Sequence, residues 1–290
     1  MNQTNLLDLR PLTIGELFDR SFRLYRKNFG TFLGIVFVTQ IPVFLFQIAT
    51  IAFSSSSISR GGAGVFGPIA TLIFTQIGAA ALTKAISDTY LGRSTTFRGA
   101  FQRMGGTWFT LIFATIAAAL VVGGLAIPIA LIGFIPILGP IIAIFGYIFI
   151  FLIAIVLVSL VPPVVVLEKS GVIASVKRAW ALAKLRFWWA FGYLVVLGIM
   201  SILIISGPTA LISALFNTVL TRADFVLQSI IVQTANLVLT TIFQPIRIAA
   251  ITLMYFDLRI RFEGFDLMVL SAASDAPLDD ASELTTKRSL

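Results

Sequence analysis

The side chains with the greatest potential for chemistry lie in the last long apolar stretch of the chain, at 226–256. Polar residues recur there every three or four positions, which places them on one stripe of a helix: Ser229, Gln233, Asn236, Thr240, Gln244 and Arg247. Amide and hydroxyl groups on such a stripe can hydrogen-bond a polar ligand or a neighbouring helix, and a guanidinium group can bind an anion. The stripe is therefore a candidate binding site.

Two interpretations of this polar seam remain open. Gln40 and Gln76 lie in earlier apolar stretches and are candidate partners, and hydrogen bonds between helices suffice to explain Gln and Thr. Arg247 is harder to explain, because a charged side chain at mid-depth in a bilayer costs at least about 2.5 kcal/mol. Its side chain either extends to the membrane interface or stays inside and binds an anionic headgroup.

The composition excludes much catalytic chemistry. The chain has no His and no Cys, so it lacks the commonest general base, a thiolate nucleophile and the commonest transition-metal ligands. Three acids, Asp88, Glu168 and Asp257, stand near the ends of apolar stretches and are each followed by basic residues. We interpret them as partners in interfacial ion pairs. We expect no enzyme activity, no metal and no cofactor.

The elements that position these residues are predicted to be membrane-spanning helices. Of the 290 residues, 58% are hydrophobic and only 12% are charged. A soluble domain of this length could not bury so much apolar surface. Six apolar stretches approach or exceed the roughly 20 residues that span a bilayer, near 31–53, 65–85, 108–132, 137–161, 189–215 and 226–256. The predicted fold class is an all-α polytopic membrane protein.

The distribution of charge predicts how the chain is oriented. Cations are concentrated before the first span, in the second and fourth loops and after the last span, whereas the opposite side carries only Arg60 and Arg222. The positive-inside rule places both termini in the cytoplasm, in the cytoplasmic membrane. The net charge of +8 is explained by this orientation, and we expect no nucleic-acid partner.

The segment "GELFDRSFRLYRKNFG" predicts an amphipathic helix before the first span. "TIGE" at 13–16 has the spacing of a capping box, so the helix should begin there. Such a helix lies in the headgroup plane with its aromatic side in the lipid and its basic side toward lipid phosphates. Anchoring of the first span is one interpretation, and recognition of anionic headgroups or of a cytosolic partner is the other. The candidate lipid contacts here and in the fourth loop are Arg20, Arg23, Arg26, Lys27, Lys177, Arg178 and Lys184.

The pattern of a basic, aromatic helix followed by two spans occurs three times. Phe22, Phe101 and Trp180 are spaced 79 residues apart, and so are Phe29, Trp108 and Phe187. We predict three amphipathic cytoplasmic helices, each opening a helix-hairpin unit, at about 13–90, 91–169 and 170–262. Together they form a membrane domain over 13–268, preceded by a cytoplasmic segment at 1–12. The polar residues 269–290 predict a disordered cytoplasmic tail.

Three segments carry a resemblance to a known family: "LRPLTIGELFDRSFRLYRKNF", "VPPVVVLEKSGVIASVKRAWALAKLRFWWAFG" and "ITLMYFDLRIRFEGFDL". The chain resembles the membrane domain found before some glycerophosphodiester phosphodiesterases and in many stand-alone proteins. In the fused proteins the activity belongs to a separate soluble domain that uses His, acidic residues and a metal. The resemblance therefore implies a membrane fold without that activity.

These observations favour a non-catalytic scaffold or accessory protein in a membrane or envelope process. Its expected partners are anionic lipid headgroups at the cytoplasmic face, and a protein partner that the sequence does not identify. The alternative is a transporter or lipid-handling protein with an anion site in the polar seam. An intramembrane hydrolase is the third possibility.

Overall fold

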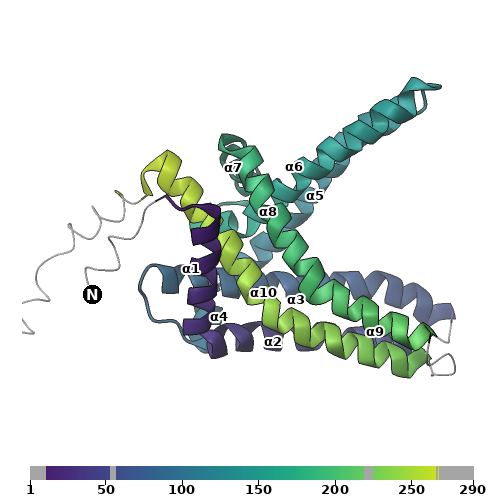
Figure 1. Ribbon diagram of the computed structural model, residues 1–290, viewed down its shortest axis with the longest axis horizontal. Coiled ribbons are helices and arrows are strands. Elements are labelled where there is room, and N and C mark those ends of the chain that lie inside the picture. The colour runs from purple at the N-terminus through teal and green to yellow at the C-terminus, as the bar shows by residue number, and fades with distance from the viewer. Residues whose placement is uncertain (1–10, 53–56, 219–224, 266, 268–290) are drawn as a thin grey trace, which may run out of the picture.

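The computed structural model describes residues 11–52, 57–218, 225–265 and 267, and this part of the chain is all-α, as the sequence predicts (Figure 1). The helices, in chain order, are α1 (Ile14–Lys27), α2 (Phe29–Ala52), α3 (Ser57–Tyr90), α4 (Phe97–Met104), α5 (Thr107–Ile132), α6 (Leu138–Glu168), α7 (Val172–Leu185), α8 (Phe187–Ser201), the π-helical turn η2 (Ile202–Ser206), α9 (Gly207–Thr218) and α10 (Phe225–Glu263). The predicted capping box is present, since the Thr13 side chain accepts from the Glu16 amide and Glu16 bonds back to Thr13.

In the part of the chain that the structure describes, six segments are long and apolar enough to cross a membrane, as many as the sequence predicts. They are Phe29–Ile51, Gly67–Tyr90, Thr107–Ile132, Leu138–Glu168, Phe187–Thr218 and Val226–Glu263. The protein is therefore a multi-pass membrane protein. Several spans are longer than the apolar stretches suggest, because α6 and α10 continue beyond their apolar part to the acidic residues Glu168 and Glu263.

The fifth span contains a break in its regular hydrogen bonding. It consists of α8, η2 and α9, and Pro208 follows directly after the first residue of α9. Proline has no amide hydrogen, and its ring clashes with the carbonyl four residues earlier, which is that of Ile204 within η2. The wider π turn accommodates this clash while the span continues.

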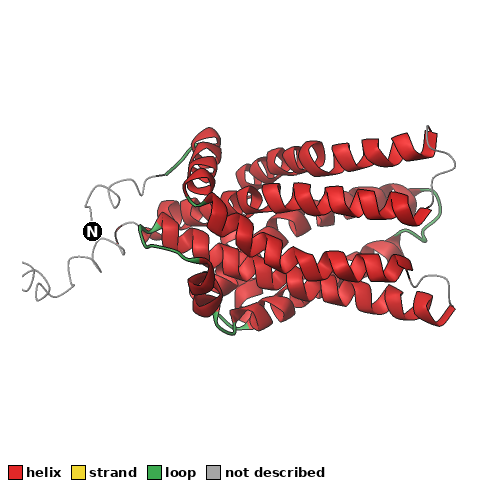
Figure 2. Cartoon of the chain, turned by 90° about the horizontal axis from the view of Figure 1, so that it is seen from below, coloured by secondary structure: helices red, strands yellow, loops and turns green. Residues whose placement is uncertain are grey.

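The short helices α1, α4 and α7 lie together at one end of the molecule. Figure 2 shows the spans running from this end toward the opposite end, where the turn between α5 and α6 lies. Helix α1 packs against α10, α4 against α3, and α7 against α6. We call this the basic end, defined by α1, α4, α7 and the last turns of α10 with Arg259 and Arg261. The charge pattern predicts that these segments share one side, and the structure places them together.

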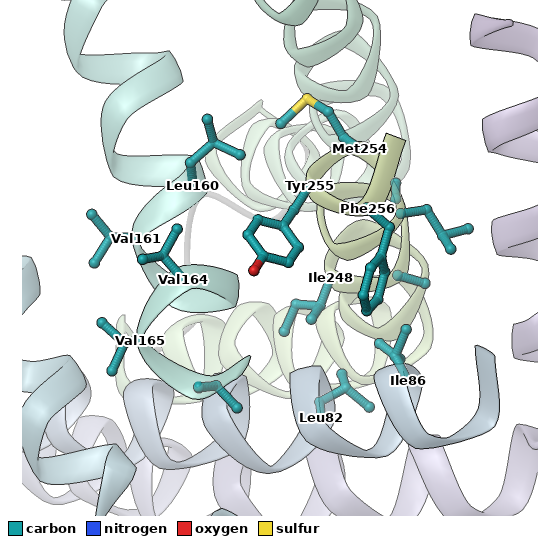
Figure 3. Packing of buried hydrophobic residues seen from close by; sticks show 14 of the residues in the cluster. Leu82, Ile86, Leu160, Val161, Val164, Val165, Ile248, Met254, Tyr255 and Phe256 are labelled. Atoms are coloured by element: carbon teal, nitrogen blue, oxygen red, sulfur yellow. The ribbon is translucent and has the colours of Figure 1, made fainter. Parts of the chain in front are cut away.

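The packed core lies close to the basic end. There the last turns of α3, α6 and α10 meet: Tyr255 lies beside Leu160 and Val164, and Phe256 lies beside Ile86 (Figure 3). The phenol ring of Tyr90 stacks on Phe256 with ring centroids 5.1 Å apart. This end therefore holds the helices in fixed relative positions.

Away from the core, the hairpin of α5 and α6 diverges from the other spans (Figure 1). Its outer part is largely uncovered by protein, with Phe134 84% exposed and Leu120 70% exposed. A surface of this kind is favourable in hydrocarbon and unfavourable in water. The exposure therefore agrees with a membrane-spanning hairpin that lipid surrounds.

Candidate functional site

Asp88, at the end of α3, is buried and paired with cations from two elements. Its carboxylate accepts from Lys84 Nζ at 3.1 Å within α3 and from Arg103 Nη1 at 3.1 Å in α4. The Asp88 side chain is only 2% exposed, so these pairs are partly shielded from water. The predicted interfacial ion pairing is thus present here, and it ties α4 to the span that precedes it.

Glu168, at the end of α6, also pairs with a cation of the short helix that follows it. Arg178 of α7 donates through Nε to both carboxylate oxygens, at 3.1 and 3.0 Å, and through Nη2 to Glu263 of α10 at 2.7 Å. The Tyr255 hydroxyl donates to Glu168 at 2.8 Å, and Arg259 donates to Glu263 at 3.0 Å. This network joins α6, α7 and α10.

Arg178 is therefore a correction to the predicted lipid contacts, because its guanidinium group is occupied by two carboxylates. Burial alone would lower the pKa of Arg178, but its hydrogen bonds to Glu263 and Glu168 outweigh burial and raise that pKa above its ordinary value. The side chain remains charged and holds three helices together. The sequence did not indicate this role, because Glu263 is 85 residues away in the chain.

Asp257 attaches the start of α1 to α10. Its Oδ1 accepts from the Leu12 amide at 2.7 Å, and its Oδ2 accepts from Arg261 Nε at 2.7 Å. Arg261 also donates through Nη2 to the Leu12 carbonyl at 2.7 Å. Each of the three predicted acids thus has its own cationic partners. Among the described residues, no group of His, Cys, Asp or Glu is arranged to hold a metal ion.

Most of the remaining predicted lipid contacts are exposed. Arg23, Arg26 and Lys27 lie on the exposed side of α1, and Lys177 and Lys184 are exposed on α7. The opposite side of α1 is buried at Leu17, Ser21 and Tyr25.

Arg20, unlike the three exposed cations of α1, packs against the protein. Its Nη1 donates to the Tyr90 hydroxyl at 3.3 Å, and its guanidinium carbon lies 5.8 Å from the Tyr90 ring centroid. Arg20 therefore helps to attach α1 to α3. The exposed charge available to lipid or partner comes from the other five predicted residues.

The polar seam of α10 is divided between two environments. Gln233 and Thr240 are partly buried, Asn236 is exposed, and the Thr240 hydroxyl donates to Asn236 Oδ1 at 3.0 Å. Nearer the basic end, Gln244 is buried. The seam therefore packs against protein at Gln244 and is exposed at Asn236, because the spans separate toward the end opposite the basic end.

Gln40 and Gln76 do not join this seam through hydrogen bonds in the described part of the chain. Gln76 is buried, and its Nε2 donates to Thr115 Oγ1 at 3.1 Å on α5, so that it links α3 to α5. Gln40, on α2, is partly buried. The interpretation of Gln76 as a residue that hydrogen-bonds between helices is confirmed, but its partner lies on α5.

Arg247 remains without a partner in the described residues. Its Nε is inaccessible to solvent and makes no hydrogen bond, and no acid of the described chain forms an ion pair with it. The nearest acid along α10 is Asp257, ten residues and therefore about 15 Å further along the helix. The Arg247 side chain as a whole is only partly buried, but a buried guanidinium nitrogen without a hydrogen bond inside a span is costly, so a bound anion would be favourable at this position.

A cavity that the sequence did not predict lies between α2 and α3, in the half of these spans remote from the basic end. Its volume is about 690 Å³, within the range of ligand pockets. It is lined by Phe46, Gln47, Thr50, Gly67, Pro68, Thr71, Leu72, Thr75 and Gln76. Residues 68, 71, 72, 75 and 76 recur at helical spacing on one face of α3, but this pattern does not show which helix lies opposite that face.

No family model, characterised protein or solved structure matches this chain in the comparisons. The resemblance to the membrane domain of glycerophosphodiester phosphodiesterases therefore stays a prediction.

Proposed function

We propose that this multi-pass membrane protein is a non-catalytic scaffold or accessory of a membrane or envelope process, with both termini in the cytoplasm. Its basic end binds anionic headgroups of the cytoplasmic leaflet and presents the short helices to a protein partner. The observation that carries this proposal is the set of five exposed cations on two short helices, at Arg23, Arg26, Lys27, Lys177 and Lys184.

The packing of the short helices supports the proposal. Helices α4 and α7 pack against the last helix of the preceding predicted unit, and α1 packs against α10, the last helix of the third unit. This arrangement favours three repeated units, at about 13–90, 91–169 and 170–262, related by rotation about the membrane normal. The buried carboxylates of Asp88 and Asp257 and the partly buried carboxylate of Glu168 keep the short helices against the spans, so that their exposed cations stay at the level of the headgroups.

Quenching of tryptophan fluorescence by brominated lipids tests the lipid part of this function. All four Trp residues lie on α7 or at the starts of α5 and α8, and Trp188 is 70% exposed. The purified chain is placed in bilayers that contain either brominated phosphatidylglycerol or brominated phosphatidylcholine at the same fraction. We expect stronger quenching by the anionic lipid.

Charge variants show whether the basic end causes the preference for anionic lipid. Each cation near an anionic leaflet contributes about 1 kcal/mol, which is about fivefold in affinity. In Arg23→Gln/Arg26→Gln/Lys27→Gln, the preference for the anionic lipid should therefore fall about fivefold at each lipid site that loses one cation. Asp19→Asn removes an exposed acid from the same helix and should raise that preference. Equal quenching by both lipids in the wild-type protein would refute the lipid part of the proposal.

Photocrosslinking from a defined position tests the scaffold part. A photoreactive amino acid replaces exposed Lys177 on α7 or, as the control, exposed Leu211 on the fifth span. A partner held by the basic end should crosslink from position 177 in native membranes and not from position 211. Crosslinking of the same proteins from both positions would contradict a specific scaffold surface.

A second candidate function, the handling of an anionic lipid or organic anion, is favoured by the buried and unpaired Nε of Arg247. Thermal unfolding is compared for the wild type, Arg247→Lys and Arg247→Gln, with anionic lipids, glycerophosphodiesters or small organic anions. An anion site predicts that ligand stabilises the wild type and, in part, Arg247→Lys, but not Arg247→Gln. Identical responses of all three proteins would leave no role for this site.

A further inference from the structure

The cavity between α2 and α3 is bounded by close contacts between the two helices. Toward the basic end, the helices approach at Gly78, where an added Cβ would lie 2.5 Å from Thr39 Oγ1. Toward the other end, the Phe46 ring lies against Gly67, 3.7 Å from the position of an added Cβ. The cavity of about 690 Å³ lies beyond the contact at Gly78, includes Phe46 and Gly67 in its wall, and is open at the surface of the two helices.

Some of the polar side chains in the cavity wall have no hydrogen-bond partner among the described residues. Thr50 donates to the Gln47 carbonyl at 2.7 Å, and the Gln76 amide is used by Thr115 of α5. In contrast, the side chains of Gln47, Thr71 and Thr75 make no hydrogen bond within the described part of the chain. Because hydrocarbon offers no hydrogen bonds, unpaired amide and hydroxyl groups at this depth favour a polar occupant.

The chemistry of the wall limits what that occupant can be. None of the described lining residues is charged, so nothing in the wall would compensate a phosphate or an ammonium group. Gln and Thr offer both donors and acceptors, which match a hydroxyl group and an ester carbonyl. Phe46, Pro68 and Leu72 supply apolar surface for an acyl chain.

We propose that this cavity is a binding site for a neutral glyceride, with its hydroxyl and ester groups on Gln47, Thr71 and Thr75 and an acyl chain along Phe46 and Leu72. The site lies in the half of the membrane remote from the basic end. It is therefore separate from the anionic-headgroup surface, and it does not depend on the function proposed for that surface.

Photolabelling of the full chain tests this site. The probes are diacylglycerol with a diazirine in one acyl chain and phosphatidylglycerol with the same chains, each added to the protein in phosphatidylcholine bilayers. Labelled peptides are located by mass spectrometry. We expect diacylglycerol to label the lining segments 46–50 and 67–76, to be displaced by unlabelled diacylglycerol, and to label them at least severalfold more than phosphatidylglycerol does.

Two variants alter the site, and a third serves as the control. Thr71→Val/Thr75→Val keeps the shape of the wall and removes two hydroxyl groups, so diacylglycerol should bind about tenfold more weakly. Leu72→Trp fills the cavity and should abolish labelling of these segments. Thr234→Val makes the same exchange at an exposed position on α10 and should leave labelling unchanged. Equal labelling by both lipids, or labelling of these segments that persists in both Thr71→Val/Thr75→Val and Leu72→Trp, would overturn the proposal.

Discussion

Replacement of Asp257 by Ala should release the start of α1 from α10. The Asp257 side chain is fully buried, and it accepts hydrogen bonds at 2.7 Å from the Leu12 amide and from Arg261. A hydrogen bond to a charged group contributes about 1.5–3 kcal/mol, and loss of one partner of a buried ion pair costs about 3–5 kcal/mol. Because Arg261 is partly exposed and can be rehydrated, we expect a loss of about 4 kcal/mol for Asp257→Ala.

The isosteric variant Asp257→Asn separates the hydrogen bond from the Leu12 amide from the ion pair with Arg261. An Asn side chain can still accept from the Leu12 amide, but it has no charge to pair with Arg261. We therefore expect a smaller loss, of about 2 kcal/mol. Unfolding in mixed micelles would measure these differences. Hydrogen exchange of the α1 amides would show whether the loss is local, with faster exchange over Ile14–Lys27 than over α5 and α6.

The control is Asp19→Ala, which removes an exposed carboxylate from α1 itself. It should change the free energy of unfolding by less than about 0.5 kcal/mol and leave exchange in α1 unchanged. If Asp257→Ala behaves like Asp19→Ala in both measurements, then the contacts of Asp257 do not hold α1, and the reasoning is wrong.

Two further predictions concern groups that the structure leaves unpaired or crowded. The Tyr25 hydroxyl is buried and without a hydrogen-bond partner in the described residues, and burial raises its pKa above the ordinary value of 10.0. The unfolded chain therefore ionises first, so this tyrosine's contribution to stability is complete below pH 10 and falls as the pH rises above 10. Tyr25→Phe should be neutral or stabilising at pH 8, and its advantage over the wild type should grow by pH 11; unfolding at both values would show the difference, and a destabilised variant at pH 8 would contradict the assignment. Gly78→Ala should destabilise the packing of α2 on α3 by about 1–3 kcal/mol, because the new Cβ would lie 2.5 Å from Thr39 Oγ1. The same exchange should cost less in a Thr39→Ala background, and a double-mutant cycle without coupling would argue against this contact.

The predictable features of the molecule depend on local patterns. The number of spans followed from apolar stretches, and the start of α1 followed from the capping box at Thr13 and Glu16. The pairing of Asp88 and Glu168 with basic residues of the next short helix also followed from short separations in the chain. Such features are set by residues a few turns apart, so the sequence alone contains them.

Features that depend on how distant helices pack could not be predicted in this way. Arg178 has a predictable partner in Glu168, ten residues earlier, but its second partner, Glu263, is 85 residues away and is brought beside it only by the packing of α7 on α10. Asn236 belongs to a regular polar stripe, but its exposure depends on how far the spans diverge. The cavity between α2 and α3 depends on where two helices touch, and a pattern within one helix does not determine that.

The contacts of Leu12 with Asp257 and Arg261 also constrain the order of events during biosynthesis. They connect residues 245 and 249 positions apart, so α1 leaves the ribosome long before α10, to which it is attached, has been made. Until then, α1 has its own capping box and its contacts with α2 and α3, but it cannot pack against α10. A nascent chain that stops before residue 257 should therefore show α1 open to protease, whereas the complete chain protects it. The docking of α1 would then report that all six spans are in place.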